Sequence, residues 1–429
     1  MNKSPRKTQV PVYNARTHSS TDAVQSFIGL PVENKLLRAR RPGESLLSMQ
    51  AVVGVPVREQ DVPVVTARSF TSRSPCTDSA LPLARPSISS AEALAALTGR
   101  LGFPAGLARQ MIASSESMPY RFWIVDNSGS MQTPDGKRLV EDARGKKVAV
   151  GATRWEELTQ VVLQTAEVAA AVGARVDFHL LNSIGPQPQF MTLVTEAAAA
   201  ADTLPVSSLC TVDQMRHTLR LITPGGRTPL TNSVELISAS IQSVAPRLAA
   251  AGQKAVVVIA TDGLPDDPKT FLAALQALQT LPVWVVVRLC TSDDSVVEYW
   301  NDLDARLEAP LEVLDDEVGE AKEVHAAGNT WLTYAPQLQL ARQFGMRSKL
   351  FDLIDENRLL PSQVAIFCDE LFDCGPLPEP ELGLPAFRAA VDAQQAKVPL
   401  VYDPISHRMQ PWIDTRKIGV GKSASCAVM

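Results

Sequence analysis

Two uninterrupted apolar runs constrain the fold of this chain more than any other feature. Val256–Ile259 and Val283–Val287 consist almost entirely of β-branched residues and do not alternate with polar ones. A strand that is apolar on both sides has to be covered on both faces, as in a parallel sheet with helices on each side. A long stretch of helical character, Leu230–Ala250, precedes the first run. The sequence therefore predicts an α/β fold.

Further segments continue this alternation. Thr153 and Glu156 have the spacing of a capping box at the start of an apolar, helical stretch. The other predicted strands are Phe122–Val125, Val176–Leu180 and Leu311–Leu314, and the last predicted helix is Asn329–Phe344. We therefore expect a doubly wound, mostly parallel Rossmann-like sheet domain over residues 118–345.

The segments on either side of this domain differ in composition. Residues 1–88 are rich in Pro, Ser, Thr and Arg, which predicts a largely disordered arm. Residues 89–117 predict a helical hairpin that begins with a Ser89–Glu92 capping box. Residues 346–413 predict a helical, Pro-containing extension, with helices near 349–360 and 364–372, and residues 414–429 predict a flexible tail.

Charge is distributed unevenly along the chain. The net charge is -5, yet residues 1–90 carry twelve Lys and Arg against six Asp and Glu, and the remainder carries 29 against 40. A basic arm on an acidic body is expected either to be solvated or to contact an anionic membrane surface or the body itself. The arm has few aromatic residues for base stacking, which argues against a nucleic-acid partner.

Cysteine usage and hydropathy bear on the expected compartment. The six cysteines are scattered, without the spacing of a zinc site or of a small disulfide framework. No uncharged apolar run is long enough for a membrane span, and the basic first residues lead into no apolar stretch. We therefore expect a cytoplasmic protein.

Oxygen-bearing side chains occur where three loops begin or end. Asp126, Ser128 and Ser130 follow the first strand, Thr228 precedes the long helix, and Asp262 follows the strand Val256–Ile259. In an open parallel sheet, ligands bind at the carboxyl ends of the strands. Carboxylates and hydroxyls without soft ligands suit Mg²⁺ or Mn²⁺. These five residues are the predicted metal site.

The motif Asp-x-Ser-Gly-Ser at 126–130, together with Thr228 and Thr261-Asp262-Gly263, resembles the metal-ion-dependent adhesion site (MIDAS) of von Willebrand factor A (VWA) domains. The resemblance covers about half of the chain. It implies direct metal binding by Ser128 and Ser130, direct or water-mediated binding by Thr228, and water-mediated binding by Asp126 and Asp262. It also implies that the metal accepts an Asp or Glu side chain of a protein partner.

Two local features adjoin this site. Residues 131–152 predict an inserted hairpin that either shapes specificity or is a passive surface element. Asp266 and Asp267 are interpreted as solvated or helix-capping carboxylates rather than additional metal ligands.

The chain ends in Cys426-Ala427-Val428-Met429, which resembles a prenylation box. Three basic residues lie just upstream, and one prenyl chain alone binds membranes only marginally. In a eukaryotic host, this pattern predicts lipid attachment at Cys426 and peripheral membrane association. In a bacterial cytoplasm, the same tetrapeptide would be a chance match.

Three hypotheses about function remain open at this stage. The first is a non-enzymatic, metal-dependent protein-binding module, and no catalytic residue is assigned because no nucleophile elbow, dinucleotide fingerprint or general base is evident. The second is a scaffold whose terminal extensions bind partners while the metal is structural. The third is a metal-dependent hydrolase that uses the same carboxylates.

Overall fold

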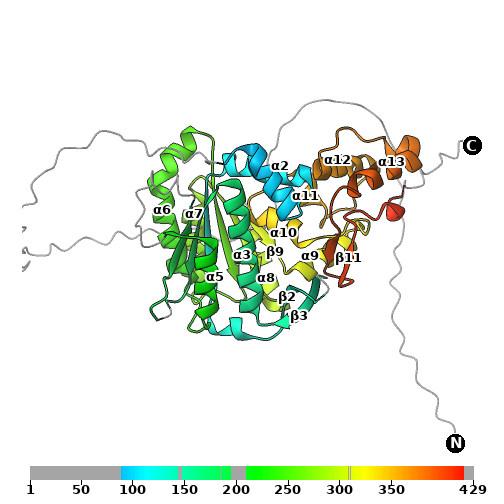
Figure 1. Cartoon of the computed structure of the whole chain (residues 1–429). Helices are drawn as coiled ribbons and strands as arrows, with labels where there is room; N and C mark the ends of the chain where they lie inside the picture. Colours follow the sequence, from blue (N-terminus) through cyan, green and yellow to red (C-terminus); the bar gives the residue numbers. More distant parts are fainter. Residues whose placement is uncertain are drawn as a thin grey trace, which may run out of the picture. The chain divides into compact units, whose positions relative to one another are not determined.

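The computed structural model describes residues 88–143, 147–183, 185–194, 209–307, 309 and 311–419. The predicted arm, except for its last residue, and the prenylation-like end with Cys426 lie outside these ranges. Within them, a central sheet is covered by helices on both faces (Figure 1). No helix in the described ranges combines the length and apolar character needed to cross a bilayer.

The described part of the sheet has seven strands in the spatial order β6-β5-β4-β1-β7-β8-β9. Strands β4, β1, β7, β8 and β9 run parallel, whereas β5 is antiparallel to β4 and pairs in parallel with the short β6. The strand bounds are β1 Tyr120–Val125, β4 Arg175–Leu180, β5 Phe190–Leu193, β6 Leu209–Cys210, β7 Ala255–Thr261, β8 Val283–Leu289 and β9 Glu312–Leu314. The predicted doubly wound, mostly parallel fold is confirmed, while the antiparallel edge was not predicted.

Side chains of each central strand alternate between two apolar layers. In β1, Trp123 and Val125 pack into one layer, and Phe122 and Ile124 pack into the other. The first layer contains α3 Arg154–Val172 and α5 Val212–Leu221, and the second contains α6 Leu230–Ala250, α7 Pro268–Gln279 and α8 Asp294–Arg306. Every residue of β7 is buried, as its uninterrupted apolar sequence predicts.

Local capping signals fix where the flanking helices begin. The Thr153–Glu156 and Ser89–Glu92 capping boxes are both formed, and helix α6 has the predicted bounds. Helix α1 Ser90–Ala95 continues as a π-helical turn, Ala96–Arg100, before α2 Ala105–Ser117.

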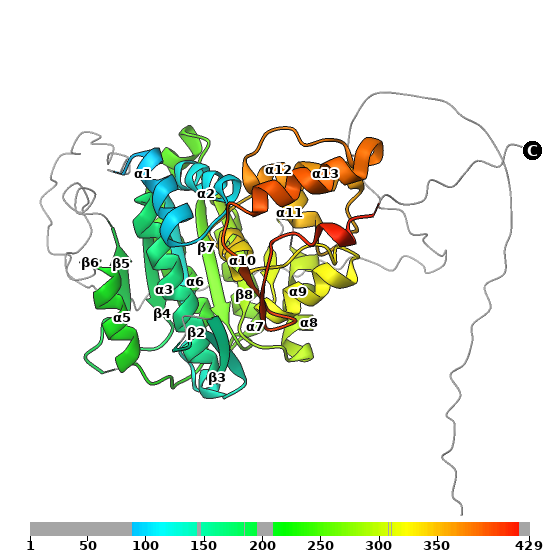
Figure 2. The same ribbon diagram turned by 45° about the vertical axis from the view of Figure 1, so that its right-hand side comes forward.

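Both flanking segments belong to the first apolar layer. Helix α2 packs against α12 Pro361–Phe372, which packs against α13 Pro380–Gln395. Figure 2 shows α11 Lys349–Leu353, α12 and α13 grouped beside α2. A hairpin of β10 Val401–Asp403 and β11 Arg408–Gln410 follows, and Trp412 and Ile413 are fully buried. The segments before and after the sheet domain therefore share one continuous core.

The structure corrects the ends of two predicted helices and adds one helix that was not predicted. The last helix of the sheet domain, α10, spans only Pro336–Gln343, because the chain forms turns as far as Trp331 and Leu332 then bridges to Ile413. The helix expected over 349–360 ends at Leu353. Helix α9 Glu317–Ala326 was not predicted, since its few apolar residues give weak periodicity.

A buried charge network joins β9, α9, α10 and the residues after α11. The Arg342 guanidinium donates to Glu312 at 2.8 Å and to Glu320 at 2.7 Å, and lies 3.1 Å from Asp355. The Arg342 side chain is 6% exposed. Removal of one partner from such a network leaves uncompensated buried charges.

We expect Arg342→Met to lower the free energy of unfolding by about 3–5 kcal/mol, because three recessed carboxylates lose their counter-charge. Arg109→Met is the matched control, since the Arg109–Asp373 pair is mostly exposed and should contribute at most about 1 kcal/mol. Urea unfolding followed by tryptophan fluorescence measures both. Equal losses in the two variants would show that the network is not a stability determinant.

Candidate metal site

The predicted site lies where the strand order reverses. Strand β1 is adjacent to β7 in the sheet, although β4, β5 and β6 intervene in the sequence. Asp126 directly follows β1, and Asp262 directly follows β7. The Asp126 amide donates to the carbonyl of Ala260 at 3.0 Å, so the two loops leave the sheet side by side. This edge is the position at which open α/β sheets bind ligands.

Asp126 is fixed by two hydrogen bonds at the base of the site. Its Oδ1 accepts from the Ser128 amide at 2.8 Å, and its Oδ2 accepts from the Thr261 hydroxyl at 2.6 Å. Burial raises the pKa of the Asp126 carboxyl, while these hydrogen bonds act in the opposite direction. Asp126 is fully buried. Its carboxylate is therefore held in one orientation before any ligand arrives.

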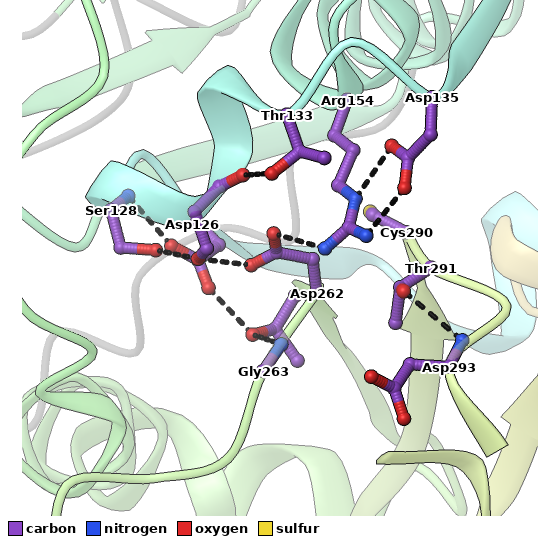
Figure 3. Close-up of polar contacts among 12 residues, drawn as sticks. Asp126, Ser128, Thr133, Asp135, Arg154, Asp262, Gly263, Cys290, Thr291 and Asp293 are labelled. Carbon is purple, nitrogen blue, oxygen red and sulfur yellow. Dashed lines mark hydrogen bonds and ion pairs between the residues drawn. The ribbon is translucent and has the colours of Figure 1, made fainter. Parts of the chain in front are cut away.

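The two serine hydroxyls join the two carboxylates. Ser128 Oγ lies 3.1 Å from Ser130 Oγ, and Ser130 Oγ donates to Asp262 Oδ1 at 2.8 Å (Figure 3). Ser128 is the N-terminal cap residue of a short 3₁₀ turn, Gly129–Gln132, which contains Ser130. Ser128 and Asp262 are buried, whereas Ser130 is exposed. The cluster is thus buried on its sheet side and accessible at Ser130.

Thr228 belongs to a loop that is hydrogen-bonded to this cluster through the backbone. The Gly129 amide donates to the Gly226 carbonyl at 3.2 Å, and the Gly225 amide donates to the Asn127 carbonyl at 2.8 Å. Among the described residues, the Thr228 hydroxyl makes no hydrogen bond to the other four predicted ligands. The structure therefore brings Asp126, Ser128, Ser130 and Asp262 into hydrogen-bond contact and places the Thr228 loop against them.

Gly226 adopts a backbone conformation that suits glycine. Its φ is +93°, and a Cβ at this position would lie 2.6 Å from Asn182 Oδ1. Asn182 is itself held in place by two hydrogen bonds: Asn182 N donates to Asn127 Oδ1 at 2.7 Å, and Asn182 Nδ2 donates to the Arg227 carbonyl at 2.8 Å. Asn182 therefore links the Thr228 loop to the Asp126 loop.

Arg154 is the residue of this region that sequence reasoning missed. Its Nη1 donates to Asp262 Oδ2 at 2.9 Å, and its Nε and Nη2 donate to the two carboxylate oxygens of Asp135 at 2.8 and 2.5 Å (Figure 3). The hydrogen bonds of this pair lower the pKa of the Asp135 carboxyl and raise the pKa of the Arg154 guanidinium. A basic residue in the first turn of a helix opposes the helix dipole. The position of Arg154 directly after the capping residue Thr153 was the sequence signal from which a role for this residue could have been inferred.

Neighbouring carboxylates and the inserted hairpin also have defined positions. Asp267 caps α7 by accepting from the amides of Lys269 and Thr270, which confirms its predicted capping role. Asp266 Oδ1 accepts from the Thr228 amide at 3.2 Å, a contact that was not predicted. The predicted hairpin is formed by β2 Gly136–Glu141 and β3 Lys147–Ala152, and residues 144–146 of its turn lie outside the described ranges.

The donor atoms of the cluster fit a hard divalent cation. Two carboxylates and two hydroxyls face one another, and oxygen donors are what Mg²⁺ and Mn²⁺ take. No group of three or more His, Cys, Asp or Glu side chains suited to a metal occurs in the described ranges, so the serine hydroxyls are essential to this donor set. Burial raises the pKa of the nearby Cys290 thiol to about 12, and a protonated thiol is a poor metal ligand.

A cavity of about 260 Å³ lies beside the cluster. Its lining includes Asp135, Glu157, Thr291 and Glu317, and none of the five predicted ligands. Burial raises the pKa of Glu317 to about 7. The predicted metal ligands therefore do not line this cavity.

Comparison with protein-family models finds no match, and no curated protein matches significantly. Among solved structures, manganese-loaded TRAP protein of Plasmodium vivax aligns with TM-score 0.27 and 13% identity, covering 46% of this chain and 69% of that one. Proximal thread matrix protein 1 of the mussel byssus aligns with TM-score 0.23 and 14% identity, covering 40% of this chain and 37% of that one. The PilB minor pilin of Streptococcus sanguinis aligns with TM-score 0.30 and 13% identity, covering 60% of this chain and 63% of that one. Scores this low assign no family to this chain.

We expect Gly226→Ala to lower the free energy of unfolding by about 1–3 kcal/mol, because alanine is strained at this φ and its Cβ meets Asn182. The Thr228 loop should shift, and the predicted Mn²⁺ binding should weaken with it. Gly225→Ala is the control, since a Cβ there meets nothing within 4 Å. Urea unfolding and Mn²⁺ titration compare the two variants. Equal effects would mean that the glycine conformation does not position this loop.

Proposed function

We propose that this chain is a divalent-metal-dependent protein-binding module of the VWA type, without enzymatic activity. The observation that carries the proposal is the hydrogen-bonded cluster of Asp126, Ser128, Ser130 and Asp262 at the carboxyl edge of β1 and β7. The motif similarity to a MIDAS supports the same assignment, as does the position at the reversal of strand order. The expected cofactor is Mg²⁺ or Mn²⁺.

Each residue has a distinct part in this mechanism. The hydroxyls of Ser128, Ser130 and Thr228 would bind the cation. The negative charges of Asp126 and Asp262 would stabilise it from the buried side of the cluster. The cation supplies a positive centre that accepts one carboxylate oxygen. Because Ser130 is the exposed member of the cluster, a partner would approach from its side and present an Asp or Glu side chain there.

The positions of other titratable groups support binding rather than hydrolysis. His179 stacks on Phe190 with ring centroids 4.2 Å apart, and burial lowers its pKa to about 4. This packing supports a structural role for His179. Among the described polar groups that contact the cluster, Arg154, Thr261 and the backbone amides donate hydrogen bonds, and none is a free general base.

We expect the purified full chain to bind one Mn²⁺ ion, with Mg²⁺ as a competitor, and Ser128→Ala/Ser130→Ala to lose this binding. Both directly coordinating hydroxyls are removed, while Asp126 and its buried hydrogen bonds are kept. Asp213→Asn is the control, because it removes an exposed carboxylate on α5. Isothermal titration calorimetry measures the affinity. Unchanged affinity in the double serine variant would exclude the assigned site.

Partner binding should depend on the same site. We expect affinity capture with wild-type protein in Mg²⁺ to retain partners that are lost both in EDTA and with Asp126→Ala. The cation is the only group that accepts the partner's carboxylate in this mechanism. Partners that are retained under both conditions would favour the scaffold hypothesis, in which residues 1–88 and 346–429 bind and the metal is structural.

We further propose that Cys426 carries a prenyl group that holds the complex at a membrane. Its support is the C-terminal tetrapeptide with basic residues upstream. In eukaryotic cells fed a clickable farnesyl analogue, we expect label on the wild type and none on Cys426→Ser, which should leave the membrane fraction. Cys374→Ser is the control cysteine variant. A wild-type chain without label would refute this part of the proposal.

A further inference from the structure

The Arg154 guanidinium has an unusual position for a residue beside a metal site. One of its nitrogens is 2.9 Å from Asp262 Oδ2. The Asp262 side chain is 0% exposed and the Arg154 side chain 15% exposed. Little water therefore separates the two charges, and their interaction is screened less than that of a surface pair. A fixed positive charge touches a carboxylate that the metal site requires.

This charge is held in place from two sides. Asp135 binds the guanidinium with both carboxylate oxygens, and the Arg154 amide donates to the Thr133 carbonyl at 3.0 Å. Thr133 in turn donates from its hydroxyl to the Ser130 carbonyl at 2.7 Å. Because bidentate Arg–carboxylate pairs fix direction as well as distance, Arg154 cannot swing freely away from Asp262.

The local sequence makes a purely structural role for this charge unexpected. Arg154 is the first residue of α3, where the helix dipole favours negative side chains, and Glu156 and Glu157 follow in the same turn. Capping of the helix is complete without the Arg154 side chain, since Thr153 and Glu156 form the capping box. The interaction that accounts for a cation here is the one with Asp135 and Asp262.

We propose that Arg154 sets the metal affinity of this site, as an internal cation that occupies one oxygen of Asp262 and opposes the binding of a divalent cation. Asp135 moderates this effect, because it neutralises part of the Arg154 charge. The inference rests on the proposed function and adds its regulation: any change that draws Arg154 toward Asp135 strengthens the metal site. Asp135 directly precedes β2, so the β2–β3 hairpin is the element through which a partner would act.

The test measures direct Mn²⁺ binding to the full chain by the loss of the free Mn²⁺ EPR signal. Arg154→Gln should tighten binding by roughly tenfold or more, the effect expected when a unit charge is removed a few ångströms from a divalent one even with strong screening. Asp135→Asn should weaken binding, because it leaves the Arg154 charge less compensated. Arg154→Lys keeps the charge and should stay close to wild type.

Two further measurements separate this role from structural support. In the Arg154→Gln background, Asp135→Asn should have a smaller effect than in wild type, since its effect is transmitted through the guanidinium. Arg154→Gln should lower the melting temperature in EDTA, where buried Asp262 loses its counter-charge, and much less in saturating Mn²⁺. A structural role would lower the melting temperature equally in both conditions.

The possible failures of the two proposals are distinguishable. If the wild type binds Mn²⁺ and Arg154→Gln binds it equally well or more weakly, the inference is wrong and the proposed metal site is retained. Mn²⁺ binding by Arg154→Gln but not by wild type supports the inference and shows that the site is closed to metal in the unmodified chain. If neither protein binds Mn²⁺, both proposals are wrong.

Discussion

The burial of β1 and β7 on both faces is the constraint on which the rest of the described structure depends. Every residue of β7 is buried, and β1 is buried from Arg121 to Val125. Strands with this environment pair in parallel at the centre of the sheet and end at the same edge. Asp126 and Asp262 are the first residues beyond that edge. The apolar core thus fixes the spacing of two charges that would repel each other in isolation.

The cost of this arrangement explains the polar groups around it. Two carboxylates with almost no exposed surface need partners, and they receive hydroxyl, amide and guanidinium donors. The same donors create the chemistry of the site. A hydroxyl that donates to a carboxylate can still offer a lone pair to a cation, so in the proposed function Ser130 both satisfies Asp262 and serves as a metal ligand. Arg154 satisfies the other oxygen of Asp262 but offers no lone pair, which is why we propose that its effect on a bound cation is opposite in sign.

The flanking segments stabilise the sheet domain by completing one of its two apolar layers. Helix α2 and helix α12 come from opposite ends of the described chain and pack against each other, and Leu107, Phe367 and Trp412 are fully buried in the layer that also contains α3. Because α3 begins at Arg154, its packing also determines where the guanidinium lies. Residues far from the metal site in sequence therefore support its geometry through the position of one helix.

Prediction from sequence was strongest where local chemistry decides the structure. The apolar runs of β7 and β8, the two capping boxes and the bounds of α6 were readable because each is set by neighbouring residues. Prediction failed where the structure of a segment depends on pairing with residues distant in sequence. Helix α10 begins only at Pro336, after Leu332 has paired with Ile413, and β5 runs antiparallel to its neighbour β4; neither pairing is visible in a local window of sequence.

The same division applies to the site. The sequence by itself determined the types and order of its oxygen donors, and the parallel pairing that it predicts was sufficient to expect Asp126 and Asp262 at one edge. Only the tertiary structure decided that Arg154 contacts Asp262, that Asp135 holds Arg154, and that Asn182 and Asp266 position the Thr228 loop. Those contacts join residues that are 19 to 108 positions apart in the chain. Their geometry depends on how helices and loops pack, which no local pattern of residues records.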